Sequence, residues 1–337
     1  MSEDAVAGAS APQPAVSIVI AVYNSERTLP ALLSACRAQD HPGPLEIVVV
    51  DDGSPDDSRR IAEQAGVRVV SQENRGPAAA RNLGWRAARA PVILFTDADC
   101  VPAADWARRL TAALDDDHAV ATGSYGIANP GSHLAELVHA EIRWRHSRFA
   151  REVEFAGSYN LGMKREALVA VAGFDESFPA PSAEDNDLSY RLHDAGFRVR
   201  FVPEAIVAHH HPSSLGRYLR EQERHGYWRV VLYALHPRRL KGDQYAGWAD
   251  LAAPPFAALA GIALVLGVFV RGALVVAAVC AAAVLLLHVS LAVRVALFAR
   301  SPKFLSLAAI GTLRAFARAW GMCRGGIAVL WRRGRGR

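Results

Sequence analysis

Val92-Ile-Leu-Phe-Thr-Asp97-Ala-Asp99-Cys-Val101 is the stretch around which the chain is organised. Its first five residues favour a buried strand, and two carboxylates follow it directly. In an extended segment, the spacing of Asp97 and Asp99 points both side chains to the same side. Ligands collect just past the carboxyl ends of parallel strands, and two carboxylates there can hold a hard divalent cation. The alternative is that both aspartates only open a turn and cap a helix.

Short apolar segments alternate with helical patterns through the first hundred residues. Strands are predicted at 16–21, 45–50 and 67–71. The first helix is predicted to begin at a Ser25 cap, and the second to lie near 56–65. Alternating strands and helices with short connections predict a doubly wound, mostly parallel α/β sheet.

Polar side chains follow three of the predicted strands. They form the pairs Tyr23 and Asn24, Asp51 and Asp52, and Asp97 and Asp99. Three such strand ends in a row predict a binding crevice at one edge of the sheet. Neither a glycine-rich dinucleotide fingerprint nor a P-loop follows a strand, which argues against both of those nucleotide sites.

The composition is uneven along the chain. Hydrophobic residues make up 51% of the 337 residues, and 251–299 is overwhelmingly apolar. The net charge is +5, but nine Lys or Arg and no acid follow residue 299, so the rest of the chain is slightly acidic. This basic tail gives no reason to predict nucleic-acid binding. The four cysteines form no Cys-x-x-Cys pair, which argues against a disulfide framework or a thiolate zinc site.

Two stretches near the end are long enough to span a membrane. The run 251–270 has no charge, and 272–299 is interrupted only by His288 and Arg294, so both are predicted as a transmembrane hairpin. A buried helix pair of a soluble protein is the alternative. The run 304–331 is typical of an interfacial amphipathic helix, although a third span stays open. The basic tail is predicted to be cytoplasmic, and two spans then place the preceding domain on the same face.

Four regions follow from these patterns. The acidic lead at 1–15 has no apolar core and is predicted to be disordered rather than a signal peptide. An α/β domain at 16–240 precedes two transmembrane helices at 251–299 and a basic amphipathic tail at 300–337.

Four motifs of the predicted α/β domain resemble those of the family 2 glycosyltransferases of GT-A fold. They are Val19-Ile-Ala-Val-Tyr-Asn24, Val49-Val-Asp-Asp-Gly-Ser54, Asn74-Arg-Gly-Pro-Ala-Ala-Ala-Arg-Asn82 and Phe95-Thr-Asp-Ala-Asp99. The order and spacing of the motifs match as well, and the resemblance covers about 16–226. It implies transfer of a sugar, with inversion, from a nucleotide diphosphate donor with a Mg²⁺ or Mn²⁺ ion.

The resemblance also implies which residues surround the nucleotide. Tyr23 would stack on the base, Asp52 would bind the base or ribose, and Arg75 would bind the base or the diphosphate. Asp97 would face the ribose or the metal. The complete implied set is Ala21, Tyr23, Glu26, Asp52, Arg75 and Asp97.

Glu184 and Asp185 open a further helical pattern. A capping box with Ser182 is one interpretation of Asp185, because the two residues lie three positions apart. The resemblance makes Asp185 the general base, a role that suits a carboxylate placed beside an attacking hydroxyl. It also implies weaker substrate contacts for Glu184 and Asn160.

The resemblance makes Asp99 a metal ligand and places a histidine beside it. His209 aligns best, although the other members of the run His209–His211 remain open. Gln222 and Arg224 lie on a basic stretch that resembles the segment gathering the donor phosphates. A solvated cationic helix face is the alternative for both.

These features predict a metal-dependent inverting glycosyltransferase on the cytoplasmic face of the cytoplasmic membrane. Its donor is expected to be a UDP-, GDP- or dTDP-sugar, and its acceptor a lipid-linked or cell-envelope glycan. An inactive membrane-tethered scaffold that binds nucleotide sugars is one rival, against which intact Asp99 and Asp185 argue. A metal-dependent phosphohydrolase built on the histidine run is another, but the sequence offers no second carboxylate–histidine cluster for it.

Overall fold

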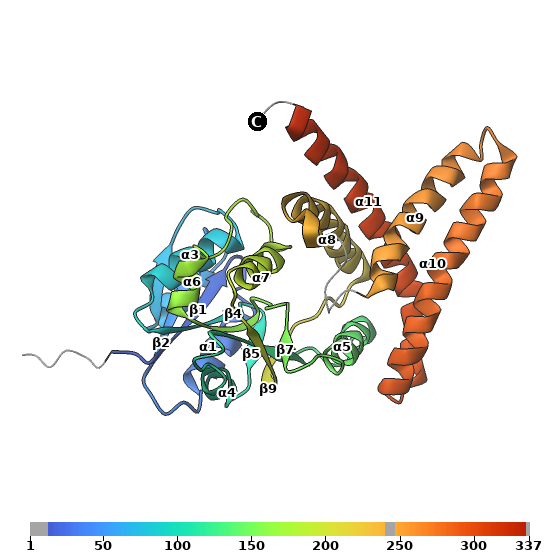
Figure 1. Cartoon of the computed structure of the whole chain (residues 1–337). Coiled ribbons are helices and arrows are strands. Elements are labelled where there is room, and N and C mark those ends of the chain that lie inside the picture. Colours follow the sequence, from blue (N-terminus) through green and yellow to red (C-terminus); the bar gives the residue numbers. More distant parts are fainter. Residues whose placement is uncertain (1–12, 240–246, 335–337) are drawn as a thin grey trace, which may run out of the picture.

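The computed structural model describes residues 13–239 and 247–334 (Figure 1). An α/β domain lies at one end of the molecule and a group of long helices at the other. Residues 1–12 of the predicted disordered lead lie outside the described residues, as does the end of the predicted α/β domain at residue 240.

The first four strands form the parallel part of one mixed sheet. They are β1 (Val16–Val22), β2 (Leu45–Asp51), β3 (Arg68–Ser71) and β4 (Val92–Asp97), in the spatial order β3-β2-β1-β4. Nearly every residue of β1 is buried, as expected for a strand covered on both faces. The parallel, doubly wound arrangement predicted from the sequence is confirmed for these strands.

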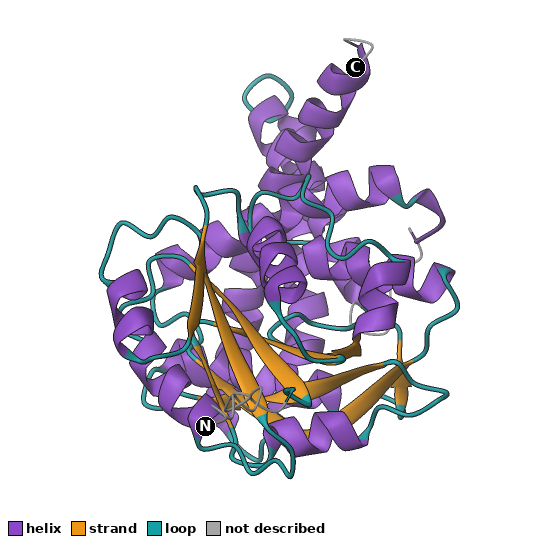
Figure 2. Ribbon diagram, turned by 90° about the vertical axis from the view of Figure 1, so that its left-hand side faces the viewer, coloured by secondary structure: helices purple, strands orange, loops and turns teal. Residues whose placement is uncertain are grey.

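Helices cover both faces of the parallel part (Figure 2). The side chains of α1 (Leu29–Arg37), α2 (Ser58–Gln64) and α4 (Trp106–Ala112) share one apolar cluster with one face of β1. The helix α3 (Pro77–Ala87) packs on the opposite face with α6 (Arg165–Ala170). The apolar core therefore lies in two layers, one on each side of the sheet.

The start of α1 differs from the prediction. The helix begins after Thr28, which makes no side-chain cap, so the predicted Ser25 cap is wrong. Ser25 instead builds the turn before the helix, because its carbonyl accepts hydrogen bonds from Thr28 and Leu29. Its hydroxyl donates to the Tyr23 carbonyl and is therefore not directed at the helix.

The second part of the sheet mixes both strand directions. It contains β5 (Cys100–Pro102), β6 (Val120–Ile127), β7 (Glu152–Val153), β8 (Asn160–Lys164) and β9 (Val199–His209). The full order is β3-β2-β1-β4-β8-β6-β9-β5, with β7 pairing β9 at the side. β8 runs antiparallel to both of its neighbours, and β5 runs antiparallel to β9. The last pairing places the segment after Asp99 beside the end of β9.

Three helices connect this sheet to the rest of the molecule. They are α5 (His133–His146), α7 (Glu184–Asp194) and α8 (Leu215–Leu235). A short 3₁₀ helix, Pro237–Arg239, follows α8. Figure 1 shows α5 and α8 lying between the α/β domain and the C-terminal helices.

Two C-terminal helices are long and apolar enough to span a membrane. They are α9 (Trp248–Leu266) and α10 (Arg271–Phe298), joined by a short turn into a hairpin (Figure 1). Many of their large apolar side chains are exposed, including Val265 at 67% and Leu286 at 68%, as are Val268 and Phe269 in the turn between them. A helix pair inside a soluble core would bury such side chains, so this exposure favours contact with lipid.

The last helix, α11 (Leu307–Gly334), packs along α8 after the 3₁₀ helix Pro302–Ser306. Three glycines permit the close approach, because a Cβ at Gly226 would lie 2.2 Å from the Arg318 carbonyl oxygen. A Cβ at Gly321 would lie 1.9 Å from the Glu223 carbonyl oxygen, and one at Gly325 would lie 2.5 Å from that of Tyr227. One face of the basic tail is thus covered by the α/β domain rather than left free.

Candidate active site

The polar strand ends meet at one edge of the sheet, as the sequence predicts. In the pairing of β1 with its neighbours, Val22 lies opposite Asp51, and Ala21 lies opposite Asp97. Tyr23 follows directly and is 51% exposed, so its ring is available for stacking on a ligand. This juxtaposition follows from the parallel register, which brings the carboxyl ends of neighbouring strands to the same edge.

Asp99 and His209 form a pair beside this edge. Cys100 pairs with His209 between β5 and β9, and His209 Nε2 lies 3.3 Å from Asp99 Oδ2. Burial by itself would raise the pKa of Asp99, but the neighbouring His209 lowers it below the usual value. Burial would lower the pKa of His209, and Asp99 raises it above the usual value. The carboxylate is therefore ionised at neutral pH.

The donor set of this pair fits a divalent cation. One ligand atom each from Asp99, Cys100 and His209 lies within 4.8 Å of the others. Burial and the adjacent carboxylates raise the pKa of Cys100 well above its usual value, so its thiol stays protonated. The carboxylate and the imidazole are the two groups that can bind Mn²⁺, which accepts both oxygen and nitrogen ligands.

The three histidines of the run lie in different positions. The His209 ring faces the Asp99 carboxylate, whereas the His210 backbone donates a hydrogen bond of 3.1 Å to the Asp99 carbonyl. His211 is buried behind His209, with their Nδ1 atoms 3.1 Å apart, and Asn129 holds its backbone. Burial and then His209 lower the pKa of His211 to about 3, so its ring is neutral. The geometry favours His209 as the metal ligand.

Asp185 lies in the first turn of α7 and is half-buried. The capping-box interpretation is wrong, because Ala183 at φ +75° precedes the helix and makes no side-chain cap. The Ser182 hydroxyl instead meets the His225 ring at 3.1 Å. Burial, and then the charge of Glu184, raise the pKa of Asp185 to about 7. A carboxylate with this pKa can accept a proton near neutral pH.

Arg81 bridges two carboxylates of the site. Its Nη2 donates to Asp97 Oδ1 at 2.7 Å, and its Nη1 donates to Glu184 Oε1 at 3.0 Å. Arg81 and Glu184 are almost fully buried, at 4% and 3% exposure. The sequence motif contains Arg81, but nothing in the sequence shows that it links β4 to α7. The structure therefore adds Arg81 to the site as the residue that joins the nucleotide edge to the helix of Asp185.

Asp52 organises the loop that follows β3. Its Oδ1 accepts hydrogen bonds from Arg75 N and Gln72 Nε2, and its Oδ2 accepts one from Gly76 N. Gly76 has φ +90°, and a Cβ there would lie 2.2 Å from the Pro179 carbonyl oxygen. Through these hydrogen bonds, Asp52 holds Arg75 at the edge of the sheet. This role does not depend on which direct contact Asp52 makes with a ligand.

The other predicted nucleotide contacts lie nearby on the surface. Arg75 pairs with Glu176 at 2.9 Å, although its side chain remains 63% exposed. The Glu26 carboxylate accepts a hydrogen bond from Asp57 N at 3.3 Å and so connects the loop after β1 to the start of α2. Both side chains are accessible from solvent.

The weaker substrate residues have different environments. Asn160 is fully buried, and its amide bonds to Trp106, the Ser124 carbonyl and the Ala205 carbonyl. These hydrogen bonds occupy the amide inside the sheet, so Asn160 is not part of the proposed site. Gln222 accepts from Arg318 at 2.9 Å, and Arg224 carries a buried Nε without a partner among the described residues.

A cavity of about 400 Å³ extends from this edge toward the C-terminal helices. Arg81, Asp97, Asp185 and His209 line one end of it. Tyr125 and Tyr159 also line it, and their rings stack at a centroid distance of 3.7 Å. Neither tyrosine was predicted as a site residue, because no local pattern in the sequence shows that the two rings meet. The far end is walled by α5, α8, α9 and α11.

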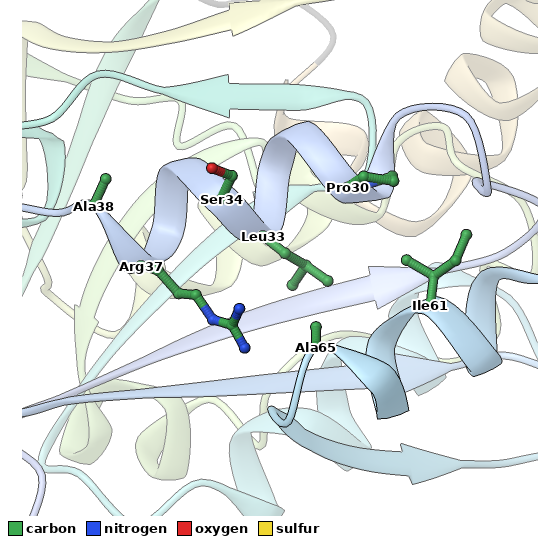
Figure 3. A pocket seen from close by; sticks show the side chains of 7 residues that line it. All are labelled: Pro30, Leu33, Ser34, Arg37, Ala38, Ile61 and Ala65. Carbon is green, nitrogen blue, oxygen red and sulfur yellow. The ribbon is translucent and has the colours of Figure 1, made fainter.

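A separate hollow of about 480 Å³ lies between α1 and α2 (Figure 3). Its lining is Pro30, Leu33, Ser34, Arg37, Ala38, Ile61 and Ala65. The lining contains one charged side chain and none of the strand-end residues. Its chemistry offers no site for a reaction, and the cavity at the strand ends is the candidate active site.

Comparison with known proteins agrees with this geometry. Residues 17–168 match the model of the family described as Glycosyl transferase family 2. The chain is 28% identical over 250 residues to a pre-mycofactocin glycosyltransferase of Mycobacterium tuberculosis, covering 70% of this chain and 51% of that protein. It is 31% identical over 235 residues to an N-acetylglucosaminyltransferase of Mesorhizobium japonicum, covering 63% and 55%. The chain thus spans about half the length of these curated relatives.

A solved structure shares the fold over nearly the whole chain. It is the mannosyltransferase PcManGT from Pyrobaculum calidifontis in complex with GDP-Man and Mn²⁺. The match has a TM-score of 0.57 at 22% identity and covers 92% of this chain and 88% of that one. The predicted GT-A fold is therefore confirmed.

Proposed function

Residues 17–168 belong to glycosyl transferase family 2, and on this premise we propose that the protein is a metal-dependent, inverting glycosyltransferase. Its donor is a nucleotide diphosphate sugar, namely a UDP-, GDP- or dTDP-sugar. The observation that carries the proposal is the shared cavity, in which Asp185 and His209 line the same end as Asp97. A proton acceptor and a metal ligand thus face one space.

The reaction is a single displacement. An acceptor hydroxyl oxygen attacks the anomeric carbon and forms the new glycosidic bond while its proton passes to the Asp185 carboxylate. The bond between the anomeric carbon and the diphosphate oxygen breaks, and the nucleoside diphosphate leaves. One displacement at one carbon inverts its configuration. The raised pKa of Asp185 supports this role, because a stronger base accepts the proton more readily near neutral pH.

The residues around the strand ends bind the donor. Tyr23 stacks on the base beside Ala21, while Glu26, Asp52 and Arg75 hold the nucleoside and the diphosphate. Asp97 contacts the ribose, and Arg81 keeps its carboxylate in place. Gln222, Arg224 and Glu184 are weaker candidates for contacts with phosphate or sugar.

Asp99 and His209 would hold the divalent metal, Mn²⁺ or Mg²⁺. When bound, such an ion neutralises the charge that grows on the departing diphosphate. The structure of mannosyltransferase PcManGT in complex with GDP-Man and Mn²⁺, a protein 22% identical to this chain, supports a metal in this fold. Among the described residues, Asp99, Cys100 and His209 form the one cluster that can hold a metal, so a two-metal phosphohydrolase finds no support.

The C-terminal helices support a location at the membrane. Helices α9 and α10 span the cytoplasmic membrane, and the catalytic domain lies on its cytoplasmic face. The exposed apolar side chains support the spans, and the basic α11 supports the orientation. The acceptor is a lipid-linked or cell-envelope glycan that receives a single sugar.

A calorimetric donor screen tests the proposal. UDP-, GDP- and dTDP-sugars are titrated into detergent-purified full-length protein, each with Mn²⁺ and with EDTA, for wild type and Asp99→Ala. We expect one nucleotide to bind only with the metal, and this binding to be lost in Asp99→Ala. Binding of no donor, or equal binding in EDTA and in the variant, would contradict the proposal.

A further inference from the structure

The half of the cavity that lies toward the C-terminal helices is lined by several charged side chains. Its wall contains charged side chains from three helices: Glu141 and Arg145 of α5, Asp250 of α9, and Arg314 and Arg318 of α11. Three of these side chains, Glu141, Arg145 and Arg314, are at most 8% exposed. None of the five has a role in the displacement reaction. Charges this deeply buried are costly unless they are paired or bind a ligand.

Among the described side chains of α5, α9 and α11 that line this half, guanidinium groups outnumber carboxylates. Arg145 donates to Glu141 at 2.7 Å and to Asp250 at 2.8 Å, and so serves both carboxylates. Arg314 donates to the second oxygen of Glu141 at 2.7 Å. Arg318 lies 3.7 Å from Asp250, too far for a hydrogen bond, and its Nε donates instead to the neutral Gln222 amide at 2.9 Å. In the part of these helices that the structure describes, three guanidinium groups thus share two carboxylates.

Two of the arginines, Arg314 and Arg318, show this surplus of positive charge individually. Arg314 Nη2 is buried and has no hydrogen-bond partner among the described residues. Burial, and then the charge of Arg314, lower the pKa of Arg318 to about 10. Glu221 also lines the cavity, but its carboxylate pairs with Arg217 at 3.1 Å. An anion between these arginines would satisfy them.

The same half also has an apolar side. Leu251 and Pro254 of α9 and Met322 of α11 line it. Asp250 lies in the first turn of α9, and the apolar run of that helix begins at the next residue. If α9 enters the membrane here, the arginines lie at the depth of lipid headgroups. Phe256 and Leu259 continue outward along α9 with 41% and 46% exposure, in the direction that a lipid chain would follow.

We propose that Arg145, Arg314 and Arg318, the arginine floor of the cavity, bind the phosphate group of a lipid-linked acceptor. The lipid chain leaves the cavity along α9, and the acceptor sugar extends toward Asp185. The inference rests on the proposed function, because it assigns the acceptor side of the same cavity. It also gives α9 and α11 a part in substrate binding in addition to holding the protein at the membrane.

The binding of farnesyl phosphate to the full-length protein in detergent tests the inference without a known acceptor. Calorimetry compares farnesyl phosphate with farnesol, which lacks the anion, and with inorganic phosphate, which lacks the chain. We expect farnesyl phosphate to bind more tightly than either. In Arg318→Gln its Kd should rise about tenfold, the loss expected for one charge-assisted hydrogen bond.

Matched variants show whether a loss of affinity in Arg318→Gln comes from the missing charge in the cavity. Arg324→Gln removes one charge from the same helix, but its side chain is 56% exposed and pairs with Glu223 outside the cavity. We expect this variant to bind farnesyl phosphate like wild type. Arg318→Lys keeps the charge and should lose less affinity than Arg318→Gln. Thermal unfolding of each variant checks that the packing of α11 on α8 survives.

Three results would overturn the inference. Farnesol binding as tightly as farnesyl phosphate would show that the cavity selects only an apolar chain. Inorganic phosphate binding as tightly would show that the lipid is irrelevant. An equal loss of nucleotide-sugar binding in Arg318→Gln would assign the arginines to the donor diphosphate.

These outcomes are separate from those of the donor screen. If no nucleotide sugar binds but farnesyl phosphate still binds through Arg318, the transferase proposal fails and the phosphate site stands. If a donor binds in the presence of metal but farnesyl phosphate does not bind, the transferase proposal stands and the phosphate site fails.

Discussion

Asp185 owes its chemical character to its position in the fold. It lies half-buried at the start of α7, next to Glu184, and both circumstances disfavour its charged form. The charge of Arg81 favours the ionised form of Asp185, but the guanidinium group donates its hydrogen bonds to Asp97 and Glu184. The resulting carboxylate is ionised over part of the neutral range and is more basic than an exposed aspartate.

The exchange Asp185→Asn tests the assignment of the base. The amide cannot accept the proton, so we expect kcat to fall by about 10²–10⁴-fold. Calorimetric binding of the donor with Mn²⁺ should change little, because the proposed role of Asp185 is toward the acceptor. A variant that retains the wild-type kcat would show that another group accepts the proton.

The pH dependence of transfer provides a second test. Below a pH of about 7, Asp185 is protonated and cannot act as a base, so kcat/KM should rise with pH through this region. Glu184→Gln removes a charge that raises the pKa, so it should move this rise to lower pH. A profile that is flat between pH 5 and 8 would contradict the assignment.

The bridge made by Arg81 predicts an effect on stability. Arg81→Met leaves Glu184 buried without its partner, and we expect the free energy of unfolding to fall by about 3–5 kcal/mol. The control is Arg86→Met, since Arg86 is 52% exposed and lies 3.6 Å from Glu176. It should cost less than about 1 kcal/mol. Denaturant unfolding measures both, and equal losses would show that the bridge does not stabilise the fold.

Some residues of the site carry a signal in the local sequence, and others do not. Asp99 stands out because it follows a strand, and His209 because it follows another, and the structure places the two 3.3 Å apart. Arg81 and Arg145 carry no such signal. Arg81 meets Glu184 across more than a hundred residues, and Arg145 meets Asp250 across a similar separation. Such partners are fixed by tertiary packing, which no local pattern records.

At the scale of elements, the alternation of apolar strands and helices predicted the parallel part of the sheet. The antiparallel β8 was not predicted, because its sequence, Asn160–Lys164, has no alternation and contains a glycine. The position of α11 also escaped prediction. Its amphipathic pattern marks one buried face, but the pattern does not tell whether lipid or α8 covers it.

The contact between α8 and α11 predicts a strong effect of one methyl group. In Gly321→Ala the new Cβ would lie 1.9 Å from the Glu223 carbonyl oxygen, so the helices must separate. We expect a loss of about 1–3 kcal/mol, seen as a lower Tm in detergent. Gly326→Ala is the control, because its Cβ would meet nothing within 4 Å. That change should leave the Tm unchanged or raise it, since alanine favours helix.

For the whole molecule, the proposed orientation in the membrane can be tested with a cysteine that the chain already contains. Cys323 of α11 is exposed, whereas Cys36, Cys100 and Cys280 are buried. A membrane-impermeant maleimide should therefore label Cys323 in inside-out vesicles and not in intact cells. Cys323→Ser should abolish the labelling. Labelling from the outside of intact cells would place α11, and the catalytic domain packed on it, on the opposite face.

The packing of α11 on α8 has a consequence for how the protein is made. Chains are synthesised from the N-terminus, so Arg314 and Arg318 leave the ribosome only after both apolar helices of the hairpin. The catalytic half of the cavity can fold earlier, but its opposite wall is completed by the last helix of the described chain. If the proposed acceptor site is correct, a nascent chain that lacks this last helix has no finished acceptor pocket. The proposed activity would then begin only after the hairpin and the last helix have been made.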